Sequence, residues 1–326
     1  MILIVGYIEE HSVQDILRYI NFANRRAIVI GHDKLEELIQ DLRISNNISN
    51  LNININNEII SLKDISIVWY RKSGIDKQYN VEELKNNHIL KDRIIFHLSR
   101  EVSGFKNAVY EYLLCFCKSL GHPYKNDINK IYSLIHAKKA GLNIPDTMLT
   151  TSLERLRKFI DSSDSIITKS IQDSLMAIDN GDIYSLYTNR ILASDISINY
   201  DEKIFPSYFQ VEIDKEYEIR TFFFNGKCYS MAIFSQVDKK TSVDYRDYNW
   251  KKMNRMVPYK LPKEIENNVT KFMDSIELTT GSIDFIKNKE NEYVFLEVNP
   301  VGQFGFVSNH CNYYLESEIA NYLLNN

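Results

Sequence analysis

Two apolar segments near the C-terminus restrict most strongly how this chain can fold. The stretch GSIDFIKNKENEYVFLEVNP reads as two strands, 281–287 and 293–299, joined by a polar turn. Side chains alternate between the two faces of a strand, so Leu296 and Val298 are predicted to point into a core and Phe295 to the opposite face. The segment therefore predicts an antiparallel hairpin with one buried face.

The other face of this hairpin carries polar side chains in an unusual arrangement. If Asn288 pairs with Tyr293 across the turn, Asp284 lies directly opposite Glu297, and Asn299 follows on the same side. Directly opposed carboxylates destabilise an antiparallel pair unless cations neutralise them. Polar pairs on edge strands often have no function, but two carboxylates beside an amide are the hard oxygen ligands that Mg²⁺ prefers. We therefore predict a metal site at this position.

The composition limits the class of protein. With 326 residues, the chain is long enough for two or three domains, each with its own core. A net charge of −4 argues against general binding to nucleic acid or to an anionic membrane. The longest apolar runs are too short to cross a bilayer, and the N-terminal MILIVGYIEE lacks the features of a signal peptide. Four scattered cysteines are typical of reduced thiols, so we expect a cytoplasmic protein with no nucleic-acid or membrane partner.

The order of the expected elements predicts a mixed α/β (α+β) chain. A strand at MILIVGY, a helix over 11–24 and a strand over 27–31 open the sequence as an α/β layer. A loop near residue 124 is a predicted domain boundary. Further along, the Asn-Gly pair at 225–226 lies between alternating segments and predicts a β-hairpin.

A series of short motifs in a fixed order resembles the ATP-grasp superfamily over residues 125–305. Lys130 opens a helix that ends in AKKAGLNIPDT, and Lys169 closes a strand, after which QVEI, EIR, a strand aspartate and the pattern E-x-N follow. Four further segments, SIVWYRKSG, DYRDYNW, NRMVPYKLP and LEVNPVGQFGFVSNHCNYYLESEIANYL, resemble the grasp-with-spasm peptide maturases. These maturases are related to the graspetide, or microviridin-type, macrocyclases, which modify ribosomally made peptides.

The resemblance implies an ATP-grasp fold in three parts. These parts are an N-terminal pre-ATP-grasp α/β domain (1–124), a central lid domain (125–209) and a C-terminal catalytic domain (210–326). ATP would be held between the lid domain and the catalytic domain, together with two Mg²⁺ ions for which Mn²⁺ can substitute.

The resemblance also assigns residues to the phosphate end of the nucleotide. Asp284, Glu297 and Asn299 would hold the Mg²⁺ ions that bridge phosphate oxygens. Lys130 and Lys169 would contact the phosphates as compact point charges. For either lysine taken alone, a solvated surface position is the alternative interpretation, and only the ordered motif series favours the phosphate role.

The adenosine end is assigned in the same way. The segment FQVEI, which contains Gln210, would be the adenine hinge, with backbone groups of Val211 and Glu212 reading the edge of the base. Glu218, in EIR, matches the position that contacts the nucleotide at the ribose.

Four cations are candidates for contact with the reacting groups. Arg220 and Arg246 match positions that steady the transferring phosphoryl group or the acyl phosphate, a role that suits a planar guanidinium. For Arg246 the alternative is an ion pair within a loop. Arg71 and Lys72 end a predicted strand, where they either face the cleft and meet acidic side chains of a peptide or form a solvated strand end.

Three functions are compatible with these assignments. The first is an ATP-dependent macrocyclase that joins Asp or Glu side chains of a precursor peptide to Lys amines or Ser/Thr hydroxyls, forming ω-amide or ω-ester crosslinks. Its precursor would carry a leader segment that docks in the region 80–215, and the resemblance implies a homo-oligomer, a dimer or higher. The second is a ligase that adds amino acids to a protein or small molecule, and the third is a non-catalytic nucleotide-binding protein.

Overall fold

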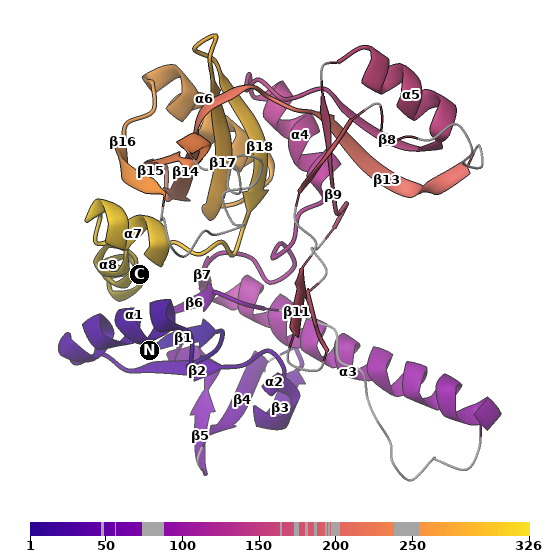
Figure 1. Ribbon diagram of the computed structural model, residues 1–326. Coiled ribbons are helices and arrows are strands. Elements are labelled where there is room, and N and C mark those ends of the chain that lie inside the picture. The colour runs from indigo at the N-terminus through magenta and orange to yellow at the C-terminus, as the bar shows by residue number, and fades with distance from the viewer. Residues whose placement is uncertain are drawn as a thin grey trace. The chain divides into compact units, whose positions relative to one another are not determined.

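The chain is described by a computed structural model and forms two compact units (Figure 1). The first unit contains residues 1–127 and 314–326, and the second contains residues 128–313. The structure describes residues 1–46, 49–55, 57–73, 88–163, 165–172, 176–179, 182–185, 188–192, 194, 196, 203–237 and 254–326.

A parallel sheet forms the centre of the first unit. Its strand order is β2 (Ala27–Ile30), β1 (Ile2–Val5), β6 (Ile67–Tyr70) and β7 (Lys118–Leu120). Every residue of β1 and β6 is buried, as expected for parallel strands that are covered on both faces. The predicted strand–helix–strand opening is confirmed, because α1 (His11–Phe22) connects β1 to β2.

The remaining elements of the first unit surround this sheet. They are α2 (Leu35–Leu38), η1 (Leu62–Asp64), α3 (His88–Phe116) and a small antiparallel sheet of β3 (Ile39–Ile44), β4 (Ser49–Ile55) and β5 (Glu58–Ser61). The C-terminal helix α8 (Leu315–Asn325) also belongs to this unit and packs against α1. None of the helices in the described ranges, α3 included, is both long enough and apolar enough to cross a membrane.

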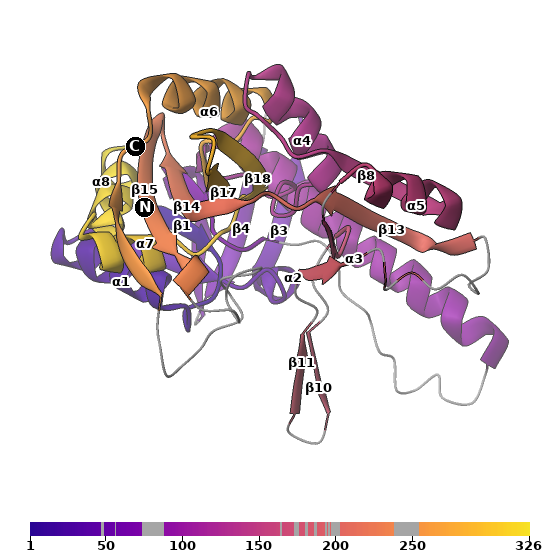
Figure 2. The same ribbon diagram turned by 45° about the horizontal axis from the view of Figure 1, so that its top comes forward.

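One antiparallel sheet of the second unit has the order β12 (Asn189–Ile191), β9 (Ile166–Lys169), β13 (Lys203–Val211) and β8 (Thr147–Ser152). Helix α5 (Leu153–Asp161) lies along β8 and β13 (Figure 2) and buries Leu156 and Ile160 against Phe209. The hairpin of β10 (Met176–Asp179) and β11 (Asp182–Ser185) is a separate two-stranded sheet.

A five-stranded antiparallel sheet forms the rest of the second unit. Its order is β16 (Arg255–Tyr259), β15 (Lys227–Phe234), β14 (Lys215–Phe224), β17 (Thr280–Asn288) and β18 (Tyr293–Asn299). Helices α4 (Lys130–Lys139) and α6 (Lys263–Ser275) contribute to the core on one face, while α7 (Gly305–Cys311) packs against β15 on the other. The predicted Asn-Gly hairpin is confirmed, since both residues at 225–226 have positive φ between β14 and β15. A short 3₁₀ helix, η4 (Ser235–Val237), follows β15.

The register of the β17–β18 hairpin differs from the prediction at the turn and agrees with it at the polar pair. Lys287, and not Asn288, pairs with Tyr293. A β-bulge at Leu296 then adds one residue to β18 and shifts the register by one position. Asp284 therefore pairs with Glu297, as predicted, although the turn pairing from which this was inferred is wrong.

The same bulge changes which side chains face the core. Phe295 is fully buried in the core beside Phe272 and Phe285, so its predicted orientation toward the polar face is wrong. Leu296 lines a pocket with Glu297 and does not enter that core. Strict alternation fails here because the bulge places two consecutive residues on the pocket side of β18.

Candidate active site

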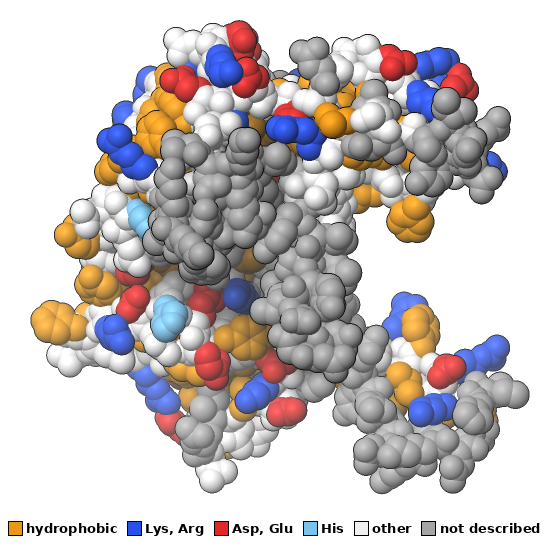
Figure 3. All heavy atoms as spheres, viewed as in Figure 1, with side chains coloured by type: hydrophobic (Ala, Val, Ile, Leu, Met, Phe, Trp, Pro, Cys, Tyr) orange, Lys and Arg blue, Asp and Glu red, His pale blue; other side chains and the backbone are white. Residues whose placement is uncertain are grey.

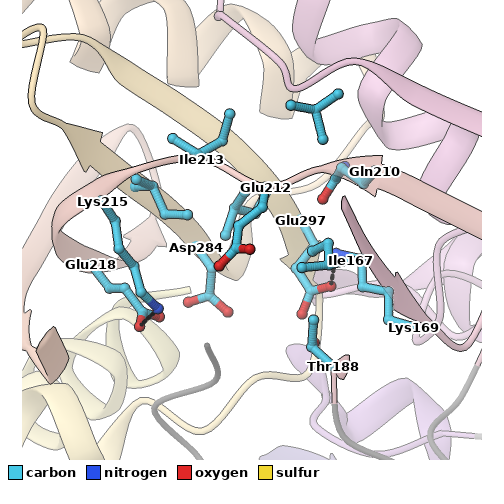
Figure 4. A pocket seen from close by; sticks show the side chains of 13 residues that line it. Ile167, Lys169, Thr188, Gln210, Glu212, Ile213, Lys215, Glu218, Asp284 and Glu297 are labelled. Atoms are coloured by element: carbon cyan, nitrogen blue, oxygen red, sulfur yellow. Dashed lines mark hydrogen bonds and ion pairs between the residues drawn. The ribbon is translucent and has the colours of Figure 1, made fainter. Parts of the chain in front are cut away.

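A pocket in the second unit lies where its two larger sheets approach each other (Figure 4). Strands β9, β13, β14, β17 and β18 all contribute to it. Its lining residues are Ile167, Lys169, Thr188, Gln210, Val211, Glu212, Ile213, Lys215, Glu218, Asp284, Ile286, Leu296 and Glu297. The pocket therefore brings together most of the residues that the sequence assigns to a nucleotide and a metal.

Asp284 and Glu297 form the acidic centre of this pocket, and each has a cation beside it. The Nη1 atom of Arg220 lies 3.3 Å from both carboxylate oxygens of Asp284, with which Arg220 is paired across β14 and β17. The Nζ atom of Lys169 lies 3.3 Å from Oε2 of Glu297. All four side chains are between 12% and 22% exposed. The opposed carboxylates are thus offset by cations, as the sequence analysis requires.

Asn299 lies at the end of β18, outside the residues that line the pocket. Its Oδ1 atom accepts a hydrogen bond of 3.1 Å from the N–H of Val301, which is an Asx-type turn. No group of three or more His, Cys, Asp or Glu side chains in the described ranges could hold a metal ion. Two carboxylates and one amide nevertheless fit Mg²⁺, which takes few protein ligands and leaves positions for water and phosphate.

Glu218 is buried at the other end of the pocket in a short ion pair. Its Oε1 atom accepts hydrogen bonds of 2.7 Å from Lys215 and 2.8 Å from the Ser235 hydroxyl. Burial raises the pKa of Glu218, and Lys215 and Ser235 only partly offset this rise. Lys215 was not predicted as a site residue, because in a regular strand residues 215 and 218 would lie on opposite faces. A bulge between Lys215 and Tyr217 turns Lys215 to the same side.

The hinge segment is only partly available to a base. The N–H of Val211 donates to the carbonyl of Asp146 (2.9 Å), and the N–H of Glu212 donates to the carbonyl of Ser165 (3.0 Å). Within the described ranges no acceptor is found for the N–H of Ile213, the next residue, which also lines the pocket. The predicted reading of a base by Val211 and Glu212 is therefore restricted to their carbonyl groups, and the sequence analysis missed Ile213.

Two polar side chains of the hinge are hydrogen-bonded to other side chains of the protein. Both carboxylate oxygens of Glu212 accept from Arg190, at 2.6 Å and 2.5 Å. Burial acts to raise the pKa of Glu212, but the hydrogen bonds from Arg190 and from a neighbouring serine outweigh it, and the net pKa is lowered. The buried amide of Gln210 donates to the hydroxyl of Tyr208 (2.7 Å) and to Thr147 (3.0 Å). These contacts position β13 against its neighbouring strands.

Lys130 does not line the pocket. Its Nζ atom donates to the carbonyls of Gln172 and Ile171, in the segment that follows Lys169. Asn129 caps the helix that Lys130 opens, as its side chain accepts the N–H groups of the next turn. Lys130 is thus attached to the loop after β9, and its phosphate role stays a prediction.

The other predicted cations lie elsewhere. Arg246 lies outside the described residues. Arg71, in the first unit, is only 4% exposed and donates to Glu10 through Nε (2.8 Å) and Nη2 (2.5 Å). Lys72 is 37% exposed, with Nζ 3.6 Å from the same carboxylate. Arg71 is therefore neither a solvated strand end nor an uncompensated charge, because Glu10 already pairs with it inside this unit.

Three aliphatic side chains that were not predicted to belong to the site also line the pocket. Ile167 comes from β9, Ile286 from β17 and Leu296 from the bulge of β18. An aromatic base requires apolar surfaces of this kind on its two faces. Their only signal in the sequence is their position two residues from Lys169, two from Asp284 and one from Glu297.

The described architecture is the ATP-grasp fold, because solved structures of ATP-grasp ligases match almost the whole chain. The predicted fold class is confirmed. Comparison of the sequence with models of known protein families finds no match, and neither does comparison with curated proteins.

Three of these solved structures are informative. An ATP-grasp ligase of Chryseobacterium gregarium, described as RiPP-associated and in complex with ADP and a leader and core peptide, has a TM-score of 0.81 at 24% identity and covers 99% of this chain and 96% of its own. The macrocyclase MdnC of Microcystis aeruginosa, bound with the precursor peptide MdnA, has a TM-score of 0.75 at 22% identity, with coverage of 100% and 99%. The ATP-grasp ligase PsnB, complexed with a minimal precursor, Mg and ADP, has a TM-score of 0.73 at 16% identity, with coverage of 99% and 97%.

Proposed function

We propose that this chain is an ATP-dependent peptide macrocyclase that joins Asp or Glu side chains of a precursor peptide to Lys amines or Ser/Thr hydroxyls. The observation that carries the proposal is the pair of opposed carboxylates, Asp284 and Glu297, with a cation beside each, in one pocket of an ATP-grasp fold. The solved structures that share the fold over nearly their whole length and hold peptides support the choice of substrate.

The reaction would proceed in two steps. A carboxylate oxygen of the peptide attacks the γ-phosphorus of ATP, so that an acyl phosphate forms and ADP leaves. An amine or hydroxyl of the same peptide then attacks the acyl carbon, loses its proton, and displaces phosphate. The product is an amide or ester, and the peptide loses one water for each crosslink. Because the attacking carboxylate and the triphosphate are both anionic, the protein must neutralise and align them.

The residues at the acidic centre would change partners when the nucleotide binds. Asp284, Glu297 and Asn299 would hold Mg²⁺, which supplies positive charge to the phosphate oxygens. Lys169, which pairs with Glu297 at 3.3 Å, would then be released from that carboxylate to contact a phosphate. Lys130, which opens α4 and donates to the loop after β9, would contact a phosphate from that position.

The adenosine would lie in the apolar part of the pocket. Its amino group would donate to a carbonyl of the hinge at Val211 or Glu212, and a ring nitrogen would accept the N–H of Ile213. Glu218, fixed by Lys215, would contact the ribose. These assignments use only hinge groups that no described residue occupies.

Arg220 and Arg246 would steady the transferring phosphoryl group and the acyl phosphate. Arg220 is already held beside Asp284, which lines the pocket, so it needs no large movement to meet negative charge there. Lys72, the more exposed of the two cations after β6, is the better candidate for contact with an acidic peptide side chain.

The proposed organisation keeps the three segments of the sequence analysis. The nucleotide would be held between the lid segment 125–209 and the catalytic segment 210–326, and residues 1–124 would form the N-terminal domain. The leader of the precursor would dock in the region 80–215 and raise the effective concentration of the core segment. The enzyme would act as a homo-oligomer.

Intact-mass spectrometry tests this function directly. A precursor peptide encoded beside the gene is incubated with the protein, ATP and Mg²⁺, and we expect the loss of one or more waters. The variant Glu297→Gln with Asn299→Ala should give no product, whereas Glu290→Gln, an exposed glutamate in the turn of the same hairpin, should behave as the wild type.

Each other outcome contradicts a different part of the proposal. A gain in mass would indicate the ligase that adds amino acids. An unchanged precursor with turnover of ATP would be compatible with the ATP-grasp fold and would reject peptide crosslinking. Nucleotide binding without turnover would indicate a non-catalytic protein. Full dehydration by the double variant would contradict the metal site.

A further inference from the structure

A buried hydroxyl lies on β17 two residues before Asp284. Ser282 is 1% exposed, and its Oγ atom has no hydrogen-bond partner among the described residues. Buried polar side chains in folded proteins are nearly always paired, so each exception requires an explanation. An unpaired hydroxyl beside a proposed metal site indicates a partner that is not yet in place.

Ser282 faces the one proposed metal ligand that lies outside the pocket. It pairs directly with Asn299 across β17 and β18, and it shares its face of β17 with Asp284. Directly opposed residues of an antiparallel pair have Cβ atoms about 4.5–5.5 Å apart. The hydroxyl is therefore within reach of the carboxamide of Asn299 after a rotation of that side chain.

The loop that follows Asn299 closes over this hydroxyl. A Cβ atom added to Gly302 would lie 2.4 Å from Cβ and 2.5 Å from Oγ of Ser282, so only glycine fits at that position. The N–H of Gly302 donates to the carbonyl of Asn299 at 3.1 Å and holds the loop there. Ser282 is thus covered on the loop side.

The carboxamide of Asn299 has two ends with different requirements. Its Oδ1 atom accepts the N–H of Val301 in this structure, and the side chain is exposed. If Oδ1 is to ligate a metal ion, the NH₂ group must point away from the metal, and it then requires an acceptor. The side chains that fix the orientation of a metal ligand are a regular part of metal sites.

We propose that Ser282 is a positioning residue of the metal site. Its Oγ atom accepts a hydrogen bond from Nδ2 of Asn299 and thereby directs Oδ1 of Asn299 toward the metal ion held by Asp284 and Glu297. The inference rests on the proposed function, since it needs a metal ion at this centre. It also explains why a hydroxyl is buried without a partner in the chain as described.

The test uses Ser282→Ala and measures the binding of Mn²⁺ in the presence of ADP by electron paramagnetic resonance. We expect the affinity for Mn²⁺ to fall about 10–100-fold, the usual effect of losing a side chain that orients a metal ligand. Without metal, the melting temperature should stay the same or rise, because the removed hydroxyl makes no hydrogen bond. Ser230→Ala is the matched control: this buried serine of the same sheet bonds Thr221 at 2.8 Å, so its loss should lower the melting temperature and leave Mn²⁺ binding unchanged.

A double-variant cycle ties the effect to Asn299. In the Asn299→Ala background, Ser282→Ala should cause no further loss of Mn²⁺ affinity. Unchanged affinity of the single Ser282→Ala variant, or an equal loss in both backgrounds, would overturn the role while the metal site itself stands. If the wild type binds no Mn²⁺ with ADP, the proposed metal–nucleotide site fails, and this role fails with it.

Discussion

Replacing Arg220 by Gln should reveal how the metal-free protein tolerates its acidic centre. In the wild type, the carboxylates of Asp284 and Glu297 are directly opposed, and Arg220 and Lys169 each offset the charge of one of them. Gln keeps the size and polarity of the side chain approximately and removes its charge. Asp284 then faces Glu297 without the charge of Arg220.

The expected loss of stability follows from the burial of these groups. Two unit charges about 6 Å apart repel by about 3 kcal/mol at an effective dielectric constant of about 20. Since the carboxylates are about one-fifth exposed, solvent screening reduces this figure. We expect a loss of about 1–2 kcal/mol in the free energy of unfolding, between the values typical of surface pairs and of buried ones. For a domain of 150–250 residues, this lowers the melting temperature by about 2–8 °C.

Thermal unfolding with and without Mg²⁺ measures this effect. Mg²⁺ replaces the missing charge, so it should stabilise Arg220→Gln more than the wild type, in which it must compete with two cations. Arg255→Gln is the control, because Arg255 is an exposed arginine on the same sheet whose guanidinium stacks on Phe234. A metal-free Arg220→Gln protein as stable as the wild type, with an equal shift in Mg²⁺, would refute the reasoning.

Two further substitutions test the other ion pairs. Lys169→Met should bind Mg²⁺ more tightly than the wild type in the absence of nucleotide, because Lys169 no longer occupies Glu297. The same variant should bind ADP with Mg²⁺ at least about tenfold more weakly, as titration calorimetry would detect. Weaker binding of the free metal would contradict the exchange of partners. Glu10→Gln removes the negative charge that pairs with the buried Arg71 guanidinium and should lower the free energy of unfolding by about 3 kcal/mol at neutral pH. Burial acts to raise the pKa of Glu10, but the charge and hydrogen bonds of Arg71 outweigh it, so the net pKa is lowered. The stability that this ion pair contributes is therefore present above the unfolded-state pKa of about 4.3 and is lost as the pH falls through the lower folded-state pKa. Denaturant titrations of the wild type and of Glu10→Gln should converge in that acid range.

Features carried by local patterns were predictable from the sequence. The order of motifs was sufficient for the fold class, and the short connection between β17 and β18 was sufficient to predict their antiparallel pairing. Asp284 lies opposite Glu297 as predicted only because the bulge at Leu296 compensates for a turn pairing that was predicted one residue off. The Asn-Gly turn at 225–226 was equally local, since its backbone conformation depends on those two residues. Each of these inferences spans fewer than twenty residues, or uses order alone.

The pairing of charges was not predictable, because it depends on distant parts of the chain. Lys169 and Glu297 are 128 positions apart, and Arg220 and Asp284 are 64 apart. A pattern along the chain can indicate that the two carboxylates need cations beside them, but it does not identify the residues that supply those cations. For the same reason the two interpretations of Arg71 both missed its actual partner, Glu10, which lies 61 positions away beyond the end of another strand.

The strands that line the pocket depart from regular alternation where the site requires it. The extra residue at Leu296 lets Phe295 and Val298 both enter the core, while Leu296 and Glu297 both face the pocket. Regular alternation could not meet these two demands, since two of the four side chains would lie on the wrong face. The second bulge, between Lys215 and Tyr217, has the same consequence on β14, because it turns Lys215 toward Glu218. A bulge costs local pairing and re-aims side chains. Two of the three strands that this sheet contributes to the pocket carry one, which marks the side of the sheet on which function, and not packing, determines the backbone.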